Sequence, residues 1–143
     1  MPLLKIREKT IPFSPFDKDL TLARAALVST TGVHLRSQTP FDLASRRGDP
    51  TYREIPSSAS VSDMVITHGH YDQADAERDL NVVFPIERLR ELVDEGVLGS
   101  LAPTFFSFMG FVLDTKYLEE TYAPEAAAKL SAEDVDLVIL TPG

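Results

Sequence analysis

Two short, unbroken apolar runs constrain the fold of this chain more than any other feature. "ARAALVSTTG" (residues 23–32) and "VDLVILTPG" (residues 135–143) each lead from apolar residues into threonine and glycine. Continuous apolar runs, as opposed to alternating ones, are typical of strands that are buried on both faces in a parallel sheet. The two runs therefore predict buried parallel strands whose ends emerge into loops.

The segments between these runs predict helices. "FPIERLRELVDEG" (84–96) has apolar residues at helical spacing, with Pro85 suited to the first turn and Gly96 to the stop. A second helical region from Asp114 to Ala132 is expected to break at Pro124 and then resume, and a short helix is expected near "DQADAERDL". Strands alternating with helices predict an α/β fold, an open and mostly parallel sheet with flanking helices, incomplete at the C-terminus.

The remaining segments complete a one-domain layout. Residues 1–20 predict an extended N-terminal arm, packed by Ile11, Phe13 and Phe16, and residues 21–143 a single α/β domain. "TYREIP" and Met64–Ile66 predict brief strands, "APTFFSFMGF" a buried strand or loop, and residues 33–50 a long ordered loop.

Composition excludes several classes of function. The sequence has 22 acidic and 14 basic residues, a net charge of -8, which disfavours binding to nucleic acid or to an anionic membrane. No apolar run is long enough to span a bilayer and no secretory signal is present, so we expect a cytoplasmic protein. The sequence contains no cysteine, which leaves no thiol for catalysis, disulfides or zinc within these residues.

The predicted strand ends carry the candidate site. Ligands of open α/β sheets bind beyond the carboxyl ends of the strands, so Thr30-Thr31-Gly32, Thr67-His68-Gly69 and Thr141-Pro142-Gly143 should share one rim. Thr30, Thr31 and Gly32 could form a backbone cradle for an anionic substrate group, or an ordinary turn, because no dinucleotide or Walker spacing is present.

The polar side chains of this rim allow several roles. His34, His68 and His70 could transfer protons, bind substrate or ligate a metal with Asp72, or they could simply cap backbone groups. We assign His68 and His70 to catalysis, Asp72 to orienting an imidazole, and no residue to a metal. Like the cradle residues, His34 is assigned to substrate binding, and Arg36 to clamping a carboxylate.

Several collinear segments resemble one family. They are "ALVSTTGVHLRSQTPFDL", "GDPTYREIP", "ITHGHYDQADAERDLNVVFPIERLRELVDEGVLG", "SFMG" and "DLVILTPG". From about Ala25 to Gly143 the chain resembles the selenoprotein B family, the selenocysteine subunits of glycine, sarcosine, betaine and D-proline reductases.

The resemblance implies a reaction. It implies an oxidoreductase that reductively cleaves a carbon–nitrogen bond α to a carboxylate, with a selenolate or thiolate attacking the α carbon. Reducing equivalents would come through a thiol electron donor, and a pyruvoyl group on a partner subunit can hold the amine. The implied partners are other reductase subunits and a small carboxylate or amine substrate.

The resemblance also places the nucleophile. In the family, the strand that matches "DLVILTP" leads directly into a motif with selenocysteine or cysteine, so a selenocysteine is expected just after Gly143. Thr141, Pro142 and Gly143 would then lie next to this redox residue, and residues 1–143 alone would be inactive and carry no cofactor. Two alternatives stay open, a non-catalytic domain for small-ligand binding or assembly, and a metal-dependent hydrolase that uses the histidines.

Overall fold

The computed structural model describes residues 13–143, so most of the predicted N-terminal arm, including Ile11, lies outside the described residues. The described part of the arm does not pack as expected. The side chain of Phe13 is 85% exposed and that of Phe16 is 44% exposed. Within residues 13–143, none of the helices combines the length and the apolar character needed to cross a bilayer.

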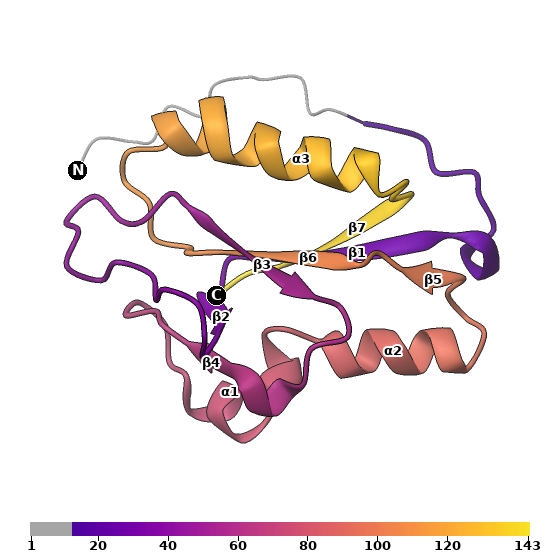
Figure 1. Ribbon diagram of the computed structural model, residues 1–143, viewed down its shortest axis with the longest axis horizontal. Coiled ribbons are helices and arrows are strands. Elements are labelled where there is room, and N and C mark those ends of the chain that lie inside the picture. The colour runs from indigo at the N-terminus through magenta and orange to yellow at the C-terminus, as the bar shows by residue number, and fades with distance from the viewer. Residues whose placement is uncertain (1–12) are drawn as a thin grey trace.

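The main sheet is built around β1 (Arg24–Ser29). This strand is parallel to β5 (Ser100–Leu101) and β6 (Thr104–Phe108) along one side and to β7 (Leu137–Thr141) along the other. The outer strand β3 (Tyr52–Pro56) pairs antiparallel with β6. An open, mostly parallel sheet with flanking helices confirms the predicted α/β class (Figure 1).

Helices cover both faces of this sheet. Figure 1 shows α3 (Ala123–Ala132) on one face, and α1 (Ala74–Arg78) and α2 (Ile86–Asp94) on the other. The predicted interruption at Pro124 is wrong, because a π-helical turn, Leu118–Tyr122, runs without a break into α3. Proline is tolerated there because Pro124 lies in the first turn of α3, where its missing N–H is not needed.

A separate two-stranded ribbon lies beside the sheet. β2 (Val33–Leu35) and β4 (Met64–Ile66) pair antiparallel with each other. The expectation of an unbroken loop over residues 33–50 is therefore wrong at its start. β4 is a strand as predicted, but it belongs to the ribbon and not to the main sheet.

The hydrophobic core lies between the sheet and its helices. Phe84 and Phe105 are fully buried and meet edge to face, with ring centroids 6.3 Å apart. Across the sheet, Tyr52 packs edge to face on Phe106 at 5.4 Å. Among residues 13–143, three 3-10 turns connect the elements: Leu20–Leu22, Val61–Asp63 and Leu80–Val82.

β7 differs from its expected environment. It was predicted to be buried on both faces, but it is the outermost strand on its side of β1. None of its residues is fully buried, and Leu140 is 73% exposed. The prediction of a parallel apolar strand is confirmed, whereas the prediction of burial is wrong.

Candidate functional site

The ends of β1 and β7 meet at one edge of the sheet, which we call the strand-end rim. The N–H of Thr30 donates to the carbonyl of Thr141 (3.0 Å), and the N–H of Gly143 donates to Oγ1 of Thr30 (3.3 Å). A Cβ added to Gly143 would lie only 3.1 Å from Cε1 of Tyr71. The last residue of the chain thus touches the segment that holds His68 and His70.

Gly32 joins the end of β1 to that segment. Its N–H donates to the carbonyl of Phe108 and its carbonyl accepts from the N–H of Thr67, both at 2.9 Å. Its φ is +72°, and an added Cβ would lie 2.5 Å from the carbonyl oxygen of Thr67 and 3.0 Å from Cβ of His68. Only glycine lets the two backbones approach so closely.

The predicted anion cradle has no free N–H group. The N–H of Thr30 is bonded to Thr141, that of Thr31 to Oγ of Ser29 (3.3 Å), and that of Gly32 to Phe108. The segment is therefore tied to the sheet by its own amides, which fits the alternative of an ordinary turn. Substrate binding by these three residues stays a prediction, with the exposed side chain of Thr30 as the accessible group.

His68 is buried at the rim, with 7% of its surface exposed. The N–H of His70 donates to its Nδ1 (3.1 Å) and the N–H of Gly110 points at its Nε2 (3.2 Å). A protonated imidazole has no acceptor, so both contacts oppose the charged form. Burial lowers the pKa of His68, and the nearby charge of His70 lowers it further. These contacts suit a neutral residue that positions the loop, and they disfavour His68 as a proton donor.

His70 is the accessible imidazole of the pair. It is exposed, its ring stacks on Phe111 at 3.9 Å between centroids, and it lies 5.9 Å from the ring of His68. Stacking fixes the ring plane and leaves its edge free to meet a substrate. His70 is therefore the better placed of the two predicted catalytic histidines.

Tyr71 was not singled out from the sequence. Its hydroxyl donates to the carbonyl of Thr31 (2.9 Å), and its ring lies 4.8 Å from that of His68. Burial raises the pKa of Tyr71 to about 12, so the hydroxyl keeps its proton at neutral pH. It packs between the His68 ring and Gly143, a role that only the folded chain reveals.

Asp72 and Arg36 do not join the rim contacts. Asp72 is exposed and caps the turn before α1, where its Oδ1 accepts from the N–H of Ala74 (3.0 Å). Arg36 is also exposed, and its Nε donates to the carbonyl of Ser62 (3.2 Å). Arg36 lines a separate groove of about 550 Å³ next to β4. Orientation of an imidazole by Asp72 and carboxylate clamping by Arg36 stay predictions that these contacts do not support.

His34 is 2% exposed and fully engaged. Its Nδ1 is 2.8 Å from the carbonyl of Leu35, which can only accept, so Nδ1 carries the proton. Nε2 then accepts from the hydroxyl of Thr67 at 2.8 Å. His34 thus holds the residue before His68 in place, and its predicted contact with substrate has no free nitrogen to use.

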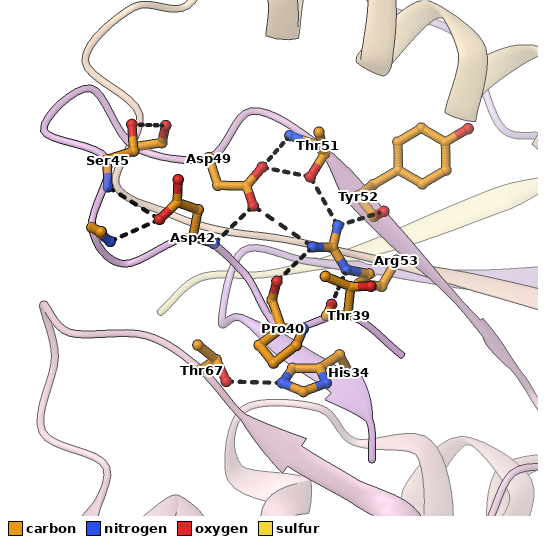
Figure 2. A network of polar contacts seen from close by, with 12 residues as sticks. His34, Thr39, Pro40, Asp42, Ser45, Asp49, Thr51, Tyr52, Arg53 and Thr67 are labelled. Carbon is orange, nitrogen blue, oxygen red and sulfur yellow. Dashed lines mark hydrogen bonds and ion pairs between the residues drawn. The ribbon is translucent and has the colours of Figure 1, made fainter. Parts of the chain in front are cut away.

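A polar network holds the long loop beside His34 (Figure 2). Arg53 donates to the carbonyls of Thr39 (2.8 Å) and Pro40 (3.0 Å), and its guanidinium lies 4.2 Å from the ring centroid of Phe41. Its Nη2 also lies 3.6 Å from the carboxylate of Asp49, and both side chains are largely buried. This network orders the chain between β2 and β3.

A row of hydroxyl groups runs across the three parallel strands at the rim. Ser29 is in register with Ser107 on one side and Thr141 on the other. Oγ of Ser29 lies 2.7 Å from Oγ1 of Thr31, and Oγ1 of Thr141 donates to the carbonyl of Val83 (2.8 Å). Oγ of Ser107 is buried without a hydrogen-bond partner among residues 13–143. The row gives the inner side of the rim a polar lining.

The metal-dependent alternative finds no ligand set in the described part of the chain. Among residues 13–143, no three His, Asp or Glu side chains are grouped so that they could hold an ion. The nitrogens of His34 and His68 already face protein groups.

The contacts of His68 predict a pH effect. Because its pKa is lowered from the ordinary value of 6.5, the unfolded chain binds more protons than the folded chain below that value. The contribution of His68 to stability is thus complete above the unfolded pKa and is lost as the pH falls toward the folded pKa. In NMR titrations, the His68 ring should have a lower midpoint in the folded chain than in urea. Equal midpoints would contradict this placement.

Comparisons with known proteins give a consistent family. The family model for glycine/sarcosine/betaine reductase selenoprotein B matches residues 4–143. The D-proline reductase subunit gamma of Acetoanaerobium sticklandii is 43% identical over 131 residues, which cover 92% of this chain and 53% of that protein. No solved structure matches.

Two further relatives belong to other reductase complexes. The glycine reductase complex component B subunit gamma of Symbiobacterium thermophilum is 31% identical, over 92% of this chain and 31% of its own length. The sarcosine reductase complex component B subunit beta of Peptoclostridium acidaminophilum is 33% identical, over 92% of this chain and 30% of its own length. The chain thus spans about half the length of the D-proline reductase relative and about a third of the other two.

Proposed function

Because the chain belongs to the glycine/sarcosine/betaine reductase selenoprotein B family, we propose that it works within a subunit of an amino-acid or amine reductase. The reaction would be the reductive cleavage of a carbon–nitrogen bond α to a carboxylate. The relatives are named as subunits of D-proline, glycine and sarcosine reductases, which supports a small amino carboxylate as the substrate.

One observation carries the placement of this chemistry. Gly143 lies against Tyr71 and donates to Thr30, beside the two histidines of the rim. A residue that follows Gly143 would begin at this rim. We propose that this residue is a selenocysteine, or a cysteine in its place, because the family model that matches the chain is that of a selenoprotein.

The reaction would pass two electrons from a dithiol to the α carbon of the substrate. A selenolate or thiolate at this position would supply the electron pair that displaces the amine from the α carbon. The leaving nitrogen takes the electron pair of the broken bond and needs a proton. The attack leaves the α carbon bonded to selenium or sulfur. One thiolate of a dithiol donor would attack that selenium or sulfur atom, and the α carbon would leave with the bonding pair and take a proton. The second thiol of the donor would then close its disulfide and release the selenolate or thiolate.

The residues of this chain would act around that step. His70 is the accessible imidazole and would give the proton to the leaving amine. His68 and Tyr71 would keep the loop in place, since their polar atoms already bond to the rim. The proposal includes partners: other reductase subunits, one of which would hold the amine on a pyruvoyl group, and a thiol electron donor.

Analysis of the native gene product tests this function. The codon after Gly143 should encode selenocysteine or cysteine, and intact mass together with selenium content should show a longer protein. Together with its partner subunits and a dithiol, that product should open the ring of D-proline or release the amine from glycine, sarcosine or betaine. A reading frame that closes with neither selenocysteine nor cysteine would remove the reductase proposal.

A further inference from the structure

The surface of β7 is unlike that of the other parallel strands. Leu140 is 73% exposed and Val138 is 39% exposed, while Leu137 and Ile139 on the opposite face are only half-buried. By contrast, Ala25 in β1, the register partner of Leu137, is fully buried. A strand of apolar residues that is exposed on one face and only half-buried on the other is not expected inside a parallel α/β sheet.

The backbone of β7 is also open on its outer side. Ser29 is in register with Thr141, and the N–H of Thr30 donates to the carbonyl of Thr141. In a parallel ladder alternate residues bond to the same neighbour, so Val138 and Leu140 direct their N–H and C=O groups away from β1. Within residues 13–143, neither residue makes a backbone hydrogen bond on that side.

This edge lacks the usual protection against pairing. Natural edge strands are blunted by charged residues, prolines or bulges. Leu137–Thr141 contains no charged residue and no proline, and its register with β1 is continuous over all five residues. Left open, the strand is a template for another strand.

The length of the relatives indicates what covers the open edge of β7. The chain spans 53% of the D-proline reductase subunit gamma, so that protein holds nearly as much polypeptide again. The known neighbours of β1, namely β5, β6 and β7, all run parallel to it. A further parallel strand needs a crossover of about a dozen residues or more, usually a helix, which could also cover Val138 and Leu140.

We propose that the free edge of β7 takes up one further parallel strand, supplied by polypeptide that continues past these 143 residues in the working subunit. This inference rests on the proposed function, because the same continuation of the chain would begin with the nucleophile at the rim. It makes β7 an internal strand of the complete sheet. The residue after Gly143 would then lie at the end of a buried strand.

Hydrogen exchange tests the covering of β7. The 143-residue chain is compared with the product of the same reading frame extended to its next stop codon, with cysteine at the codon after Gly143. The amides of Val138 and Leu140 should exchange at least about tenfold more slowly in the longer product, because strand pairing protects them. Unchanged exchange in a folded longer product would overturn the proposal.

Matched variants locate the effect at the edge. Leu140→Lys should be tolerated by the 143-residue chain, where this side chain is mostly exposed, but should remove the added protection at Val138 in the longer product. Leu113→Lys is the control, since Leu113 is apolar and 68% exposed but lies outside the strand. Loss of protection with both variants would overturn the proposal.

The outcomes separate this inference from the proposed function. A longer product that turns over substrate but leaves both amides unprotected overturns the β7 proposal alone. Protected amides, together with a native codon after Gly143 that encodes neither selenocysteine nor cysteine, overturn the proposed function alone. If the 143-residue chain is a dimer by light scattering and already protects both amides, a second copy covers the edge and the β7 proposal fails.

Discussion

Gly32→Ala should destabilise the fold by about 3 kcal/mol and displace the loop that holds the rim histidines. A φ of +72° is unfavourable for alanine, and the alanine Cβ would lie 2.5 Å from the carbonyl oxygen of Thr67. Relief of that clash must move Thr67 and His68, which breaks the 2.9 Å bond from Thr67 to Gly32. Urea unfolding measures the loss, and the NMR signals of His68 and His70 report the displacement.

Two other glycines separate the causes of this loss. Gly96 has a φ of +73° but no atom within 4 Å of an added Cβ, so Gly96→Ala should cost only about 1 kcal/mol. Gly69 lies between the two histidines, also with nothing within 4 Å, and Gly69→Ala should be near neutral. Equal losses for Gly32→Ala and Gly96→Ala would show that the close approach to Thr67 is unimportant.

Local sequence patterns predicted where the helices and strands lie better than they predicted which strands pair. Helix α2 (Ile86–Asp94) follows from the spacing of its apolar residues, with Ile86 and Leu89 buried as expected. The strand at Met64–Ile66 was also predictable, but its pairing with β2 was not. The two paired strands lie about thirty residues apart in the sequence. Whether they pair depends on the cost of closing the loop between them and on packing, and local periodicity reports neither.

The environment of β7 shows the same limit. An apolar run indicates that Val138 and Leu140 belong in an apolar environment, and it cannot tell whether the described residues supply that environment. Here they do not, because β7 has β1 on one side and an open edge on the other. The failed prediction of burial is the observation on which the proposal for β7 rests.

The sequence predicted the location of the candidate site more reliably than the roles of its residues. The rule that strand ends converge brought Thr30, Gly143 and the segment with His68 together, as the contacts show. Roles depend on which polar atoms remain free. His34 is occupied by Leu35 and Thr67, and Tyr71 gains importance only from its contact with Gly143. No sequence spacing encodes those distances.

Arg53→Met should destabilise the chain by about 3–5 kcal/mol at neutral pH, because it leaves a largely buried carboxylate without its cation and several carbonyls without their donor. Asp49 and Arg53 keep only 10% and 14% of their side-chain surfaces exposed. Burial raises the pKa of Asp49, but the hydrogen bonds from Thr51 and Asp42 and the charge of Arg53 outweigh it, so its pKa is lowered overall.

The pH dependence of Arg53→Met follows from that lowered pKa. The stability contributed by ionised Asp49 is complete above its unfolded pKa and is lost as the pH falls through the folded value. The loss caused by Arg53→Met should therefore shrink between about pH 7 and about pH 3, as measured by urea unfolding. Arg47→Met is the control: Arg47 pairs with Asp114 at 3.0 Å, a shorter distance, but its side chain is 78% exposed. Solvent screening should keep its effect under about 1 kcal/mol, and comparable losses for the two variants would contradict the importance of burial.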